Sequence, residues 1–172
     1  MESKRLPRVL LVDDDPTIPT FLDMERLRTN TPIEFEHVED VEAAIAKLNE
    51  KCYDAAIIDV RLPGVTGVSL GALVREYDVN LPLAYLTNLD GEAVRREASS
   101  QRALFLMKYN FMEGDGLNRL LKIIVELSHV NPCRAGGIRI DGSGFQRHLA
   151  ETPMELSKGL QTLLHYSRAA AA

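Results

Sequence analysis

The stretch YDAAIIDVRLPGVTG, residues 53–67, decides how the rest of the chain is interpreted. Its apolar run Ala55–Ile58 is typical of a short strand buried on both faces, as in a parallel sheet. Pro63 and Gly64 break the chain soon afterwards. Asp59 therefore lies where a buried strand ends, and open α/β sheets bind ligands outside such ends. Two interpretations stay open from this stretch alone: Asp59 is a functional acid, or it only caps the following turn.

The composition sets limits on the class of protein. The 172-residue chain is 45% hydrophobic and 26% charged, which is typical of one soluble globular domain with room for an appendage. A net charge of -5 gives no support for a broad nucleic-acid surface. The apolar runs are too short to span a bilayer. Cys52 and Cys133 lack the spacing of metal ligands, so we expect ordinary thiols in a reducing, cytoplasmic setting.

Short apolar segments alternate with segments of helical periodicity on both sides of the central strand. We expect strands to begin near residues 9, 33, 55, 82 and 103, each followed by a helix. Asp40 is positioned to cap the helix after the second strand, and residues 65–77 are expected to form the helix after the third. This alternation predicts an α/β fold: a five-stranded parallel sheet, doubly wound, with helices on both faces.

Polar side chains follow four of these strands where each strand ends. Asp13 and Asp14 follow the first strand, Asp59 the third, Thr87 the fourth and Lys108 the fifth. Because parallel strands share one carboxyl edge, we expect these side chains to meet there. Two like charges ~4 Å apart repel by about 4 kcal/mol at an effective dielectric near 20, so clustered acids need a cation or have to take up protons. Carboxylates suit Mg²⁺, and the ammonium and hydroxyl complete the parts that phosphoryl transfer requires.

Each of these residues also has an ordinary structural explanation. The paired acids would be solvated residues at a helix start, Thr87 a strand-end cap and Lys108 a surface lysine. The convergence of all of them at strand ends favours the functional interpretation.

The set VLLVDDDP (9–16), DVRLPGVTG (59–67), Leu86-Thr87 and Lys108 resembles the receiver domain of bacterial two-component response regulators over about residues 7–130. This resemblance implies a flavodoxin-like sheet of order 2-1-3-4-5. It also implies a cytoplasmic signalling domain that takes a phosphoryl group from a sensor histidine kinase or phosphotransfer protein. Such a domain catalyses its own phosphorylation and dephosphorylation and is not a metabolic enzyme.

The resemblance also implies roles for the acidic residues. Asp59 is the phosphorylation site, and it shares an Mg²⁺ ion with Asp14, which binds the metal directly. Asp13 is expected to bind the ion through water, and the backbone carbonyl of Arg61 is expected as a further ligand.

For the other site residues, the resemblance implies catalytic and switch roles. Thr87 and Lys108 each contact a phosphoryl oxygen, and Phe105 takes the place of the family's switch aromatic. Movement of Thr87 and Phe105 would remodel the face of the fourth helix, fifth strand and last helix. Two departures from the family bear on phosphoryl lifetime and on the position of the lysine: Asn88 replaces a small residue, and Tyr109 replaces a proline.

The C-terminal part of the chain is expected to serve protein contacts. The receiver domain is assigned to residues 1–130, and its last helix, 116–130, carries two apolar stripes, more than one sheet face needs. We expect a homodimer or partner surface there. Residues 131–172 are assigned to an extension, a turn-rich linker plus one or two helices, for interaction or dimerisation.

Three functions are to be distinguished. The first is a receiver that signals through protein contacts, with neither membrane nor nucleic acid as partner. The second is a DNA-binding transcriptional response regulator whose output domain is truncated or remnant. The third, a haloacid-type phosphatase, requires a second acid two residues after the nucleophile, where this sequence has Arg61.

Overall fold

A five-stranded parallel sheet forms the centre of the molecule. The computed structural model describes residues 5–109, 115–130 and 137–140. The sheet order is β2-β1-β3-β6-β7, so the predicted order 2-1-3-4-5 is confirmed, with β6 and β7 as the fourth and fifth strands. The strands are β1 (Arg8–Val12), β2 (Glu34–Val38), β3 (Ala55–Ile58), β6 (Leu83–Thr87) and β7 (Leu104–Met107). The helices predicted within residues 141–172 lie outside the described residues.

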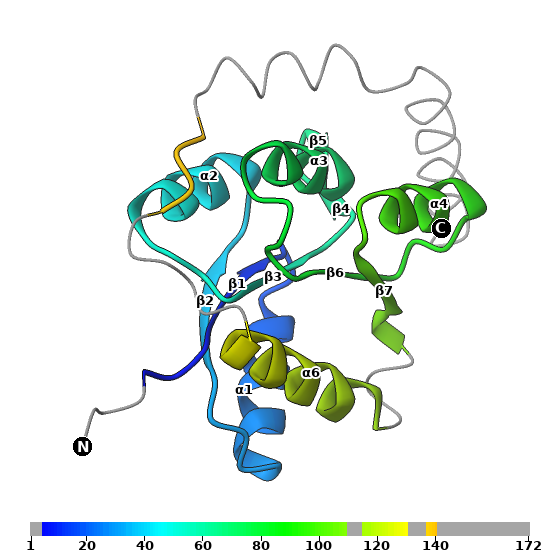
Figure 1. Cartoon of the computed structure of the whole chain (residues 1–172). Coiled ribbons are helices and arrows are strands. Elements are labelled where there is room, and N and C mark those ends of the chain that lie inside the picture. Colours follow the sequence, from blue (N-terminus) through cyan, green and yellow to red (C-terminus); the bar gives the residue numbers. More distant parts are fainter. Residues whose placement is uncertain (1–4, 110–114, 131–136, 141–172) are drawn as a thin grey trace.

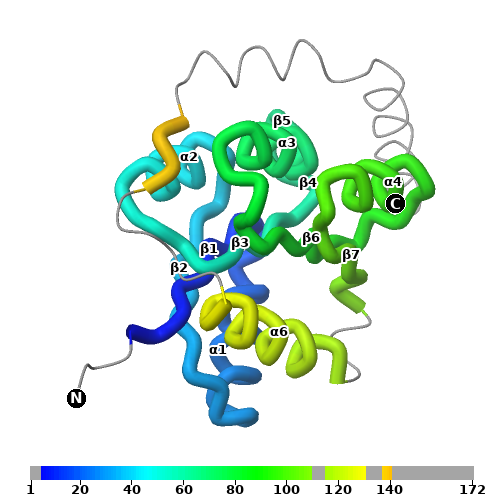
Figure 2. Tube along the Cα trace, in the orientation of Figure 1, coloured from blue at the N-terminus to red at the C-terminus, as the bar shows by residue number. Residues whose placement is uncertain are grey.

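Helices cover both faces of the sheet, which confirms the predicted doubly wound architecture. The helices are α1 (Thr17–Arg28), α2 (Val41–Glu50), α3 (Gly67–Tyr77), α4 (Glu92–Ser100) and α6 (Gly116–Val130). Figure 1 and the tube in Figure 2 show α2, α3 and α4 on one side and α1 and α6 on the other. No helix in the described part of the chain combines the length and apolar character that a bilayer span requires.

The central strand β3 is buried on both faces, as its apolar run predicted. Ala56 and Ile58 belong to the core cluster that includes side chains of α2, α3 and α4. Ala55 and Ile57 belong to the second cluster, with side chains of α1 and α6. Because neighbouring residues of a strand point to opposite faces, β3 contributes to both cores and is held firmly between them.

Two local predictions have different outcomes. Asp40 does cap α2, since its carboxylate accepts a hydrogen bond from the Ala43 N–H at 2.7 Å. The predicted helix 65–77, however, begins only at Gly67, because β5 (Val65–Thr66) pairs antiparallel with β4 (Arg61–Leu62). The Thr66 hydroxyl accepts from the Ser69 N–H and thereby caps α3, which fixes the later start.

The prediction that Cys52 is an ordinary thiol is wrong, because Cys52 is disulfide-bonded. Cys133, the only other cysteine of the sequence, lies outside the described residues. Cys52 follows α2 and precedes β3, near the end of α2 where Gly137 also lies. Such pairing depends on which distant segments fold together, and cysteine spacing along the sequence carries no signal of it.

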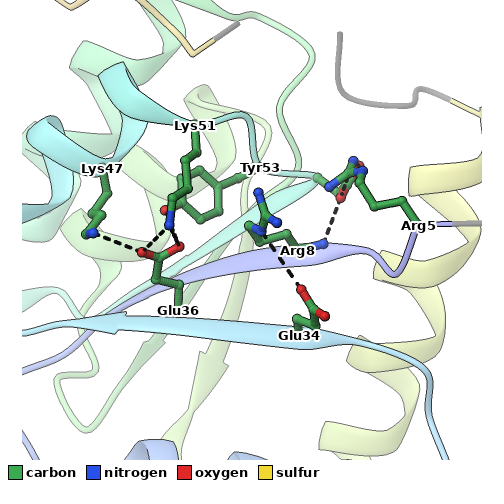
Figure 3. A network of polar contacts seen from close by, with 8 residues as sticks. Arg5, Arg8, Glu34, Glu36, Lys47, Lys51 and Tyr53 are labelled. Carbon is green, nitrogen blue, oxygen red and sulfur yellow. Dashed lines mark hydrogen bonds and ion pairs between the residues drawn. The ribbon is translucent and has the colours of Figure 1, made fainter. Parts of the chain in front are cut away.

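A charged network joins β2 to the end of α2 (Figure 3). The Glu36 carboxylate is bonded by Lys47 Nζ at 3.0 Å, by Lys51 Nζ at 3.0 Å and by the Tyr53 hydroxyl at 2.9 Å. Burial alone would raise the pKa of Glu36, but these donors together outweigh it and lower the pKa to about 2. The network therefore stabilises the fold only while Glu36 is ionised.

Replacing Glu36 by glutamine is expected to lower the free energy of unfolding by about 1 kcal/mol at pH 7, because the lysines are partly exposed. Since the folded pKa is depressed, this contribution is complete above the unfolded value of 4.5 and is lost as the pH falls toward 2. Urea denaturation from pH 7 to pH 2 measures it, with the exposed Glu39→Gln as the control. A Glu36→Gln effect that stays constant over this range would contradict the prediction.

Candidate functional site

The structure brings Asp13, Asp14, Asp59 and Lys108 together at the carboxyl edge of the sheet. Oxygen atoms of the three carboxylates lie within 4.8 Å of one another. Lys108 Nζ donates to Asp13 Oδ1 at 2.9 Å and to Asp59 Oδ2 at 2.7 Å. Asp13, Asp59 and Lys108 are buried, whereas Asp14 is exposed. The site is therefore a mostly buried acidic cluster with one side open to solvent.

Main-chain hydrogen bonds beyond the strand ends hold the two buried acids in place. The Asp13 N–H donates to the Val38 carbonyl at 3.0 Å, and the Asp59 N–H donates to the Val12 carbonyl at 2.8 Å. The sheet pairing thus continues past β1 and β3 by one residue each. Because the main chain of both acids is hydrogen-bonded to a neighbouring strand, the backbone positions that carry the two carboxylates are fixed.

Further donors orient these carboxylates. The Asp15 N–H donates to Asp13 Oδ1 at 3.0 Å, and the Arg61 N–H donates to Asp59 Oδ1 at 3.1 Å. His37 Nε2 donates to the Asp13 carbonyl at 2.7 Å. The His37 contact could not be predicted from the sequence, because it arises from the alignment of β2 beside β1 and not from a motif.

The charge at this edge is only partly balanced. Burial raises the pKa of Asp13, and the hydrogen bond from Lys108 only partly offsets it. For Lys108, burial by itself would lower the pKa, but the hydrogen bonds to Asp13 and Asp59 outweigh it and raise the pKa. The ammonium stays charged at neutral pH, yet the cluster holds three carboxylates against this one positive charge, so it favours a further cation.

The donor set fits a magnesium ion. Asp13 Oδ2 is buried and receives no hydrogen bond, although Lys108 Nζ lies 2.8 Å away. That oxygen, the neighbouring Asp59 carboxylate and the exposed Asp14 carboxylate are hard ligands. Mg²⁺ prefers such oxygens and keeps several waters, which the solvent-exposed side at Asp14 allows.

Thr87 lies at this edge and Phe105 two residues before the end of β7, and both make other contacts. Thr87 is the buried last residue of β6, and its hydroxyl accepts a hydrogen bond from the Leu89 N–H at 3.1 Å. Phe105, on β7, is half-buried, and the Arg95 guanidinium lies 4.7 Å from its ring centroid. Within the described residues no hydrogen bond joins Thr87 to the acids, so its role and that of Phe105 stay predictions.

Gly67 is a site residue that the sequence interpretation missed. A Cβ atom at this position would lie 1.9 Å from the Asp59 carbonyl oxygen and 2.7 Å from Ile58 Cγ2. The start of α3 therefore packs directly on the backbone that carries Asp59. The glycine that closes the quoted stretch was the available signal, but its spacing alone does not show this close approach.

Gly67→Ala is expected to lower the free energy of unfolding by about 3 kcal/mol, because the Asp59 backbone has to move away from the new methyl group. Gly116→Ala is the matched control, since a Cβ there meets nothing within 4 Å. It should change stability by less than about 1 kcal/mol, in the stabilising direction for a helical glycine. Chemical denaturation of both variants measures the free energy of unfolding. Equal values for the two variants would show that α3 does not pack tightly on the Asp59 backbone at Gly67.

Comparison with known protein families gives a match over most of the described region. A family model described as response regulator receiver domain matches residues 9–118. The transcriptional regulatory protein TrcR of Mycobacterium tuberculosis is 30% identical over 164 residues, which cover 92% of this chain and 63% of TrcR. This chain thus spans less than two thirds of the length of that relative.

Solved structures show the same architecture. The receiver domain of the Francisella response regulator 1452 superposes with a TM-score of 0.60 at 25% identity, covering 72% of this chain and 98% of that domain. The response regulator TrrA of Thermotoga maritima, solved in complex with Mg(2+)-BeF, gives a TM-score of 0.59 at 24% identity. That alignment covers 69% of this chain and 99% of TrrA.

Proposed function

Since this chain belongs to the response regulator receiver domain family, we propose that it accepts a phosphoryl group on Asp59 from a sensor histidine kinase or phosphotransfer protein. One observation carries the assignment to Asp59. Its buried carboxylate is hydrogen-bonded to Lys108 at 2.7 Å and lies in the same cluster as Asp13 and Asp14. A nucleophilic carboxylate, a fixed ammonium and ligands for a divalent cation are thereby gathered within one site.

In the proposed reaction an oxygen of Asp59 attacks the phosphorus atom of a phosphohistidine. The new O–P bond makes an acyl phosphate, the P–N bond breaks, and the leaving imidazole keeps the electron pair and takes a proton from solvent. Lys108 already donates to Asp59, so it can pair with a phosphoryl oxygen with little movement. The Arg61 N–H holds the carboxylate in orientation during attack.

Mg²⁺ would be held by Asp14, by Asp59 and, through water, by Asp13, with the Arg61 carbonyl as a further ligand. Bound there, it would neutralise the charge that builds up between the phosphoryl oxygens and the carboxylates. The excess of three carboxylates over the single ammonium of Lys108 supports this assignment.

We further propose that the signal leaves through the face formed by α4, β7 and α6. Thr87 would bond a phosphoryl oxygen, and Phe105 would change position beneath Arg95. One apolar stripe of α6 is buried, namely Leu117, Leu120, Leu121 and Ile124. The other stripe is exposed, with Ile123 at 40%, Leu127 at 38% and Val130 at 76%. This exposed stripe is the proposed contact for a partner or a second copy.

We propose the domain boundaries and the location as well. We assign residues 1–130 to the receiver domain and 131–172 to an extension of it, and we place the protein in the cytoplasm. The family model matches residues 9–118, so the match ends inside α6, and this supports a receiver domain that includes that helix.

The experiment for the proposed function is an intact-mass measurement. The chain is incubated with a small acyl phosphate donor and Mg²⁺, and the expected result is a gain of one phosphoryl group. The matched sample contains a chelator in excess of Mg²⁺ and should show little gain. No gain in the presence of Mg²⁺ would overturn the proposal.

Asp14→Ala is expected to weaken Mg²⁺ binding at least about 10- to 100-fold, the cost of losing a residue that only supports a metal ligand, because Asp14 is a direct ligand. Because Asp14 is exposed, its removal should leave the fold intact. Isothermal titration calorimetry with MgCl₂ measures the affinity. Asp15→Ala is the matched control, since Asp15 instead accepts hydrogen bonds from the Thr17 N–H and hydroxyl at the start of α1. Equal affinities in the two variants would reject the role of Asp14.

A second candidate is a receiver that belongs to a DNA-binding transcriptional regulator. The observation in its favour is that the similarity to TrcR extends over 164 residues, beyond the receiver match. Sequence-specific binding of promoter DNA by the product of the complete gene would support this candidate. If the phosphorylated form did not bind DNA, the second candidate would be rejected in favour of a receiver that signals through protein contacts.

A further inference from the structure

Residues 137–140 lie on the opposite face of the sheet from the helix that precedes them. Helix α6 packs in the core cluster that it shares with α1. Ile138 and Ile140, in contrast, pack in the cluster that contains side chains of α2, α3 and α4. Figures 1 and 2 show this segment beside α2. The chain therefore changes face between its last two described segments.

One side chain holds the main chain of Ile140. Asn49 Nδ2 donates to the Ile140 carbonyl at 3.0 Å, and the Ile140 N–H donates to Asn49 Oδ1 at 2.6 Å. The same N–H also lies 3.0 Å from the Ile138 carbonyl. The carboxamide thus satisfies both main-chain polar groups of one residue, as a neighbouring strand would, and it does so regardless of the side chain at that position.

The side chains of the segment fit the end of α2. A Cβ atom at Gly137 would lie 2.3 Å from the Leu48 carbonyl oxygen, so a residue with a side chain cannot approach this closely. Ile140 is only 4% exposed, whereas Arg139 points to solvent. The sequence Gly-Ile-Arg-Ile is therefore complementary to this site. The glycine lies against the α2 backbone, the two isoleucines pack inward and the arginine is exposed.

We propose that the C-terminal end of α2, with Asn49 as its polar anchor, is an intramolecular docking site for residues 137–140. The chain beyond the receiver domain then starts from the α2 side of the molecule and not from the face of α4, β7 and α6. The disulfide at Cys52, three residues after Asn49, adds a covalent constraint in the same region. The docking contacts themselves involve no part of the acidic cluster, so the proposal does not depend on phosphorylation.

The test is hydrogen–deuterium exchange with single-residue resolution on the full chain. The protein is kept reduced so that a disulfide bond cannot hold the segment. The Ile140 amide is expected to be protected in the unmodified sequence and to exchange about fivefold faster in Asn49→Ala, which loses both hydrogen bonds to the main chain. Asn80→Ala is the matched control, since Asn80 is an exposed loop asparagine, and it should leave the Ile140 rate unchanged.

A second variant keeps the test independent of one hydrogen-bonding residue. Ile140→Asp places a carboxylate in the apolar cluster and should raise the exchange rate of this amide about a hundredfold, while the amides of β3 stay protected. An unprotected Ile140 amide in the reduced protein, or equal rates in Asn49→Ala and Asn80→Ala, would overturn the proposal. Protection that increases with protein concentration would also overturn it, because a second copy would then supply the segment.

Discussion

Asp59→Asn is expected to abolish the gain of one phosphoryl group in the intact-mass experiment. Asparagine has nearly the shape of aspartate and can still accept one of the two hydrogen bonds, from Lys108 or from the Arg61 N–H, which reach different oxygens of Asp59. Its amide oxygen, however, is not a nucleophile, so no acyl phosphate can form. Labelling should fall to the level of the donor-free sample, which is the largest change that any single substitution at this site can give.

The matched control for this experiment is a substitution of Asp54, at the opposite end of β3 from Asp59. Asp54 is also a buried acid, directly before β3, and it pairs with Arg5 at 3.0 Å and accepts the Arg8 N–H at 2.7 Å. Asp54→Asn should therefore retain full labelling. Persistent labelling of Asp59→Asn would remove the site assignment. Loss of labelling in both variants, with thermal unfolding unchanged, would show that the loss is not specific to Asp59 and would also remove the assignment.

The sheet and the cluster could be predicted because their signals are local. Each strand is a short apolar run, and each functional residue follows its strand directly, as Asp13 follows Val12 and Lys108 follows Met107. Once the strands are parallel and adjacent, their carboxyl ends have to share one edge. Topology then carries Lys108 to within 2.7 Å of Asp59, 49 residues away in the sequence.

The features that escaped prediction depend on contacts between segments that share no pattern. The close approach of Gly67 to the Asp59 carbonyl, the bond from His37 to Asp13 and the docking of Ile140 on Asn49 are of this kind. Neither hydrophobic periodicity nor residue spacing reports where two such backbones meet. Side chains that bond main-chain atoms are the hardest to foresee, because the atoms they bind are present in every residue.

Lys108→Met is expected to destabilise the metal-free protein by about 3 kcal/mol at neutral pH, since it removes one partner of a buried ion pair. Asp13 and Asp59 would then be buried next to each other without a counter-charge, and burial already raises the pKa of Asp13. Methionine keeps most of the lysine's length, so the loss of stability reflects the missing charge more than a change in side-chain volume. A carboxyl whose folded pKa is raised stabilises the fold as the pH falls, so the defect should shrink toward acidic pH.

Mg²⁺ should reverse this defect, because the cation replaces the missing ammonium between the same oxygens. At a free concentration of about 100 times Kd, binding to the folded state alone restores about 2.7 kcal/mol. Thermal unfolding with and without MgCl₂ measures both effects, and Lys122→Met, an exposed lysine on α6, is the control. If Lys108→Met were as stable as Lys122→Met without metal, the ammonium would not be balancing the acids. If Mg²⁺ failed to stabilise Lys108→Met more than the unmodified chain, the three carboxylates would not act as one cation site.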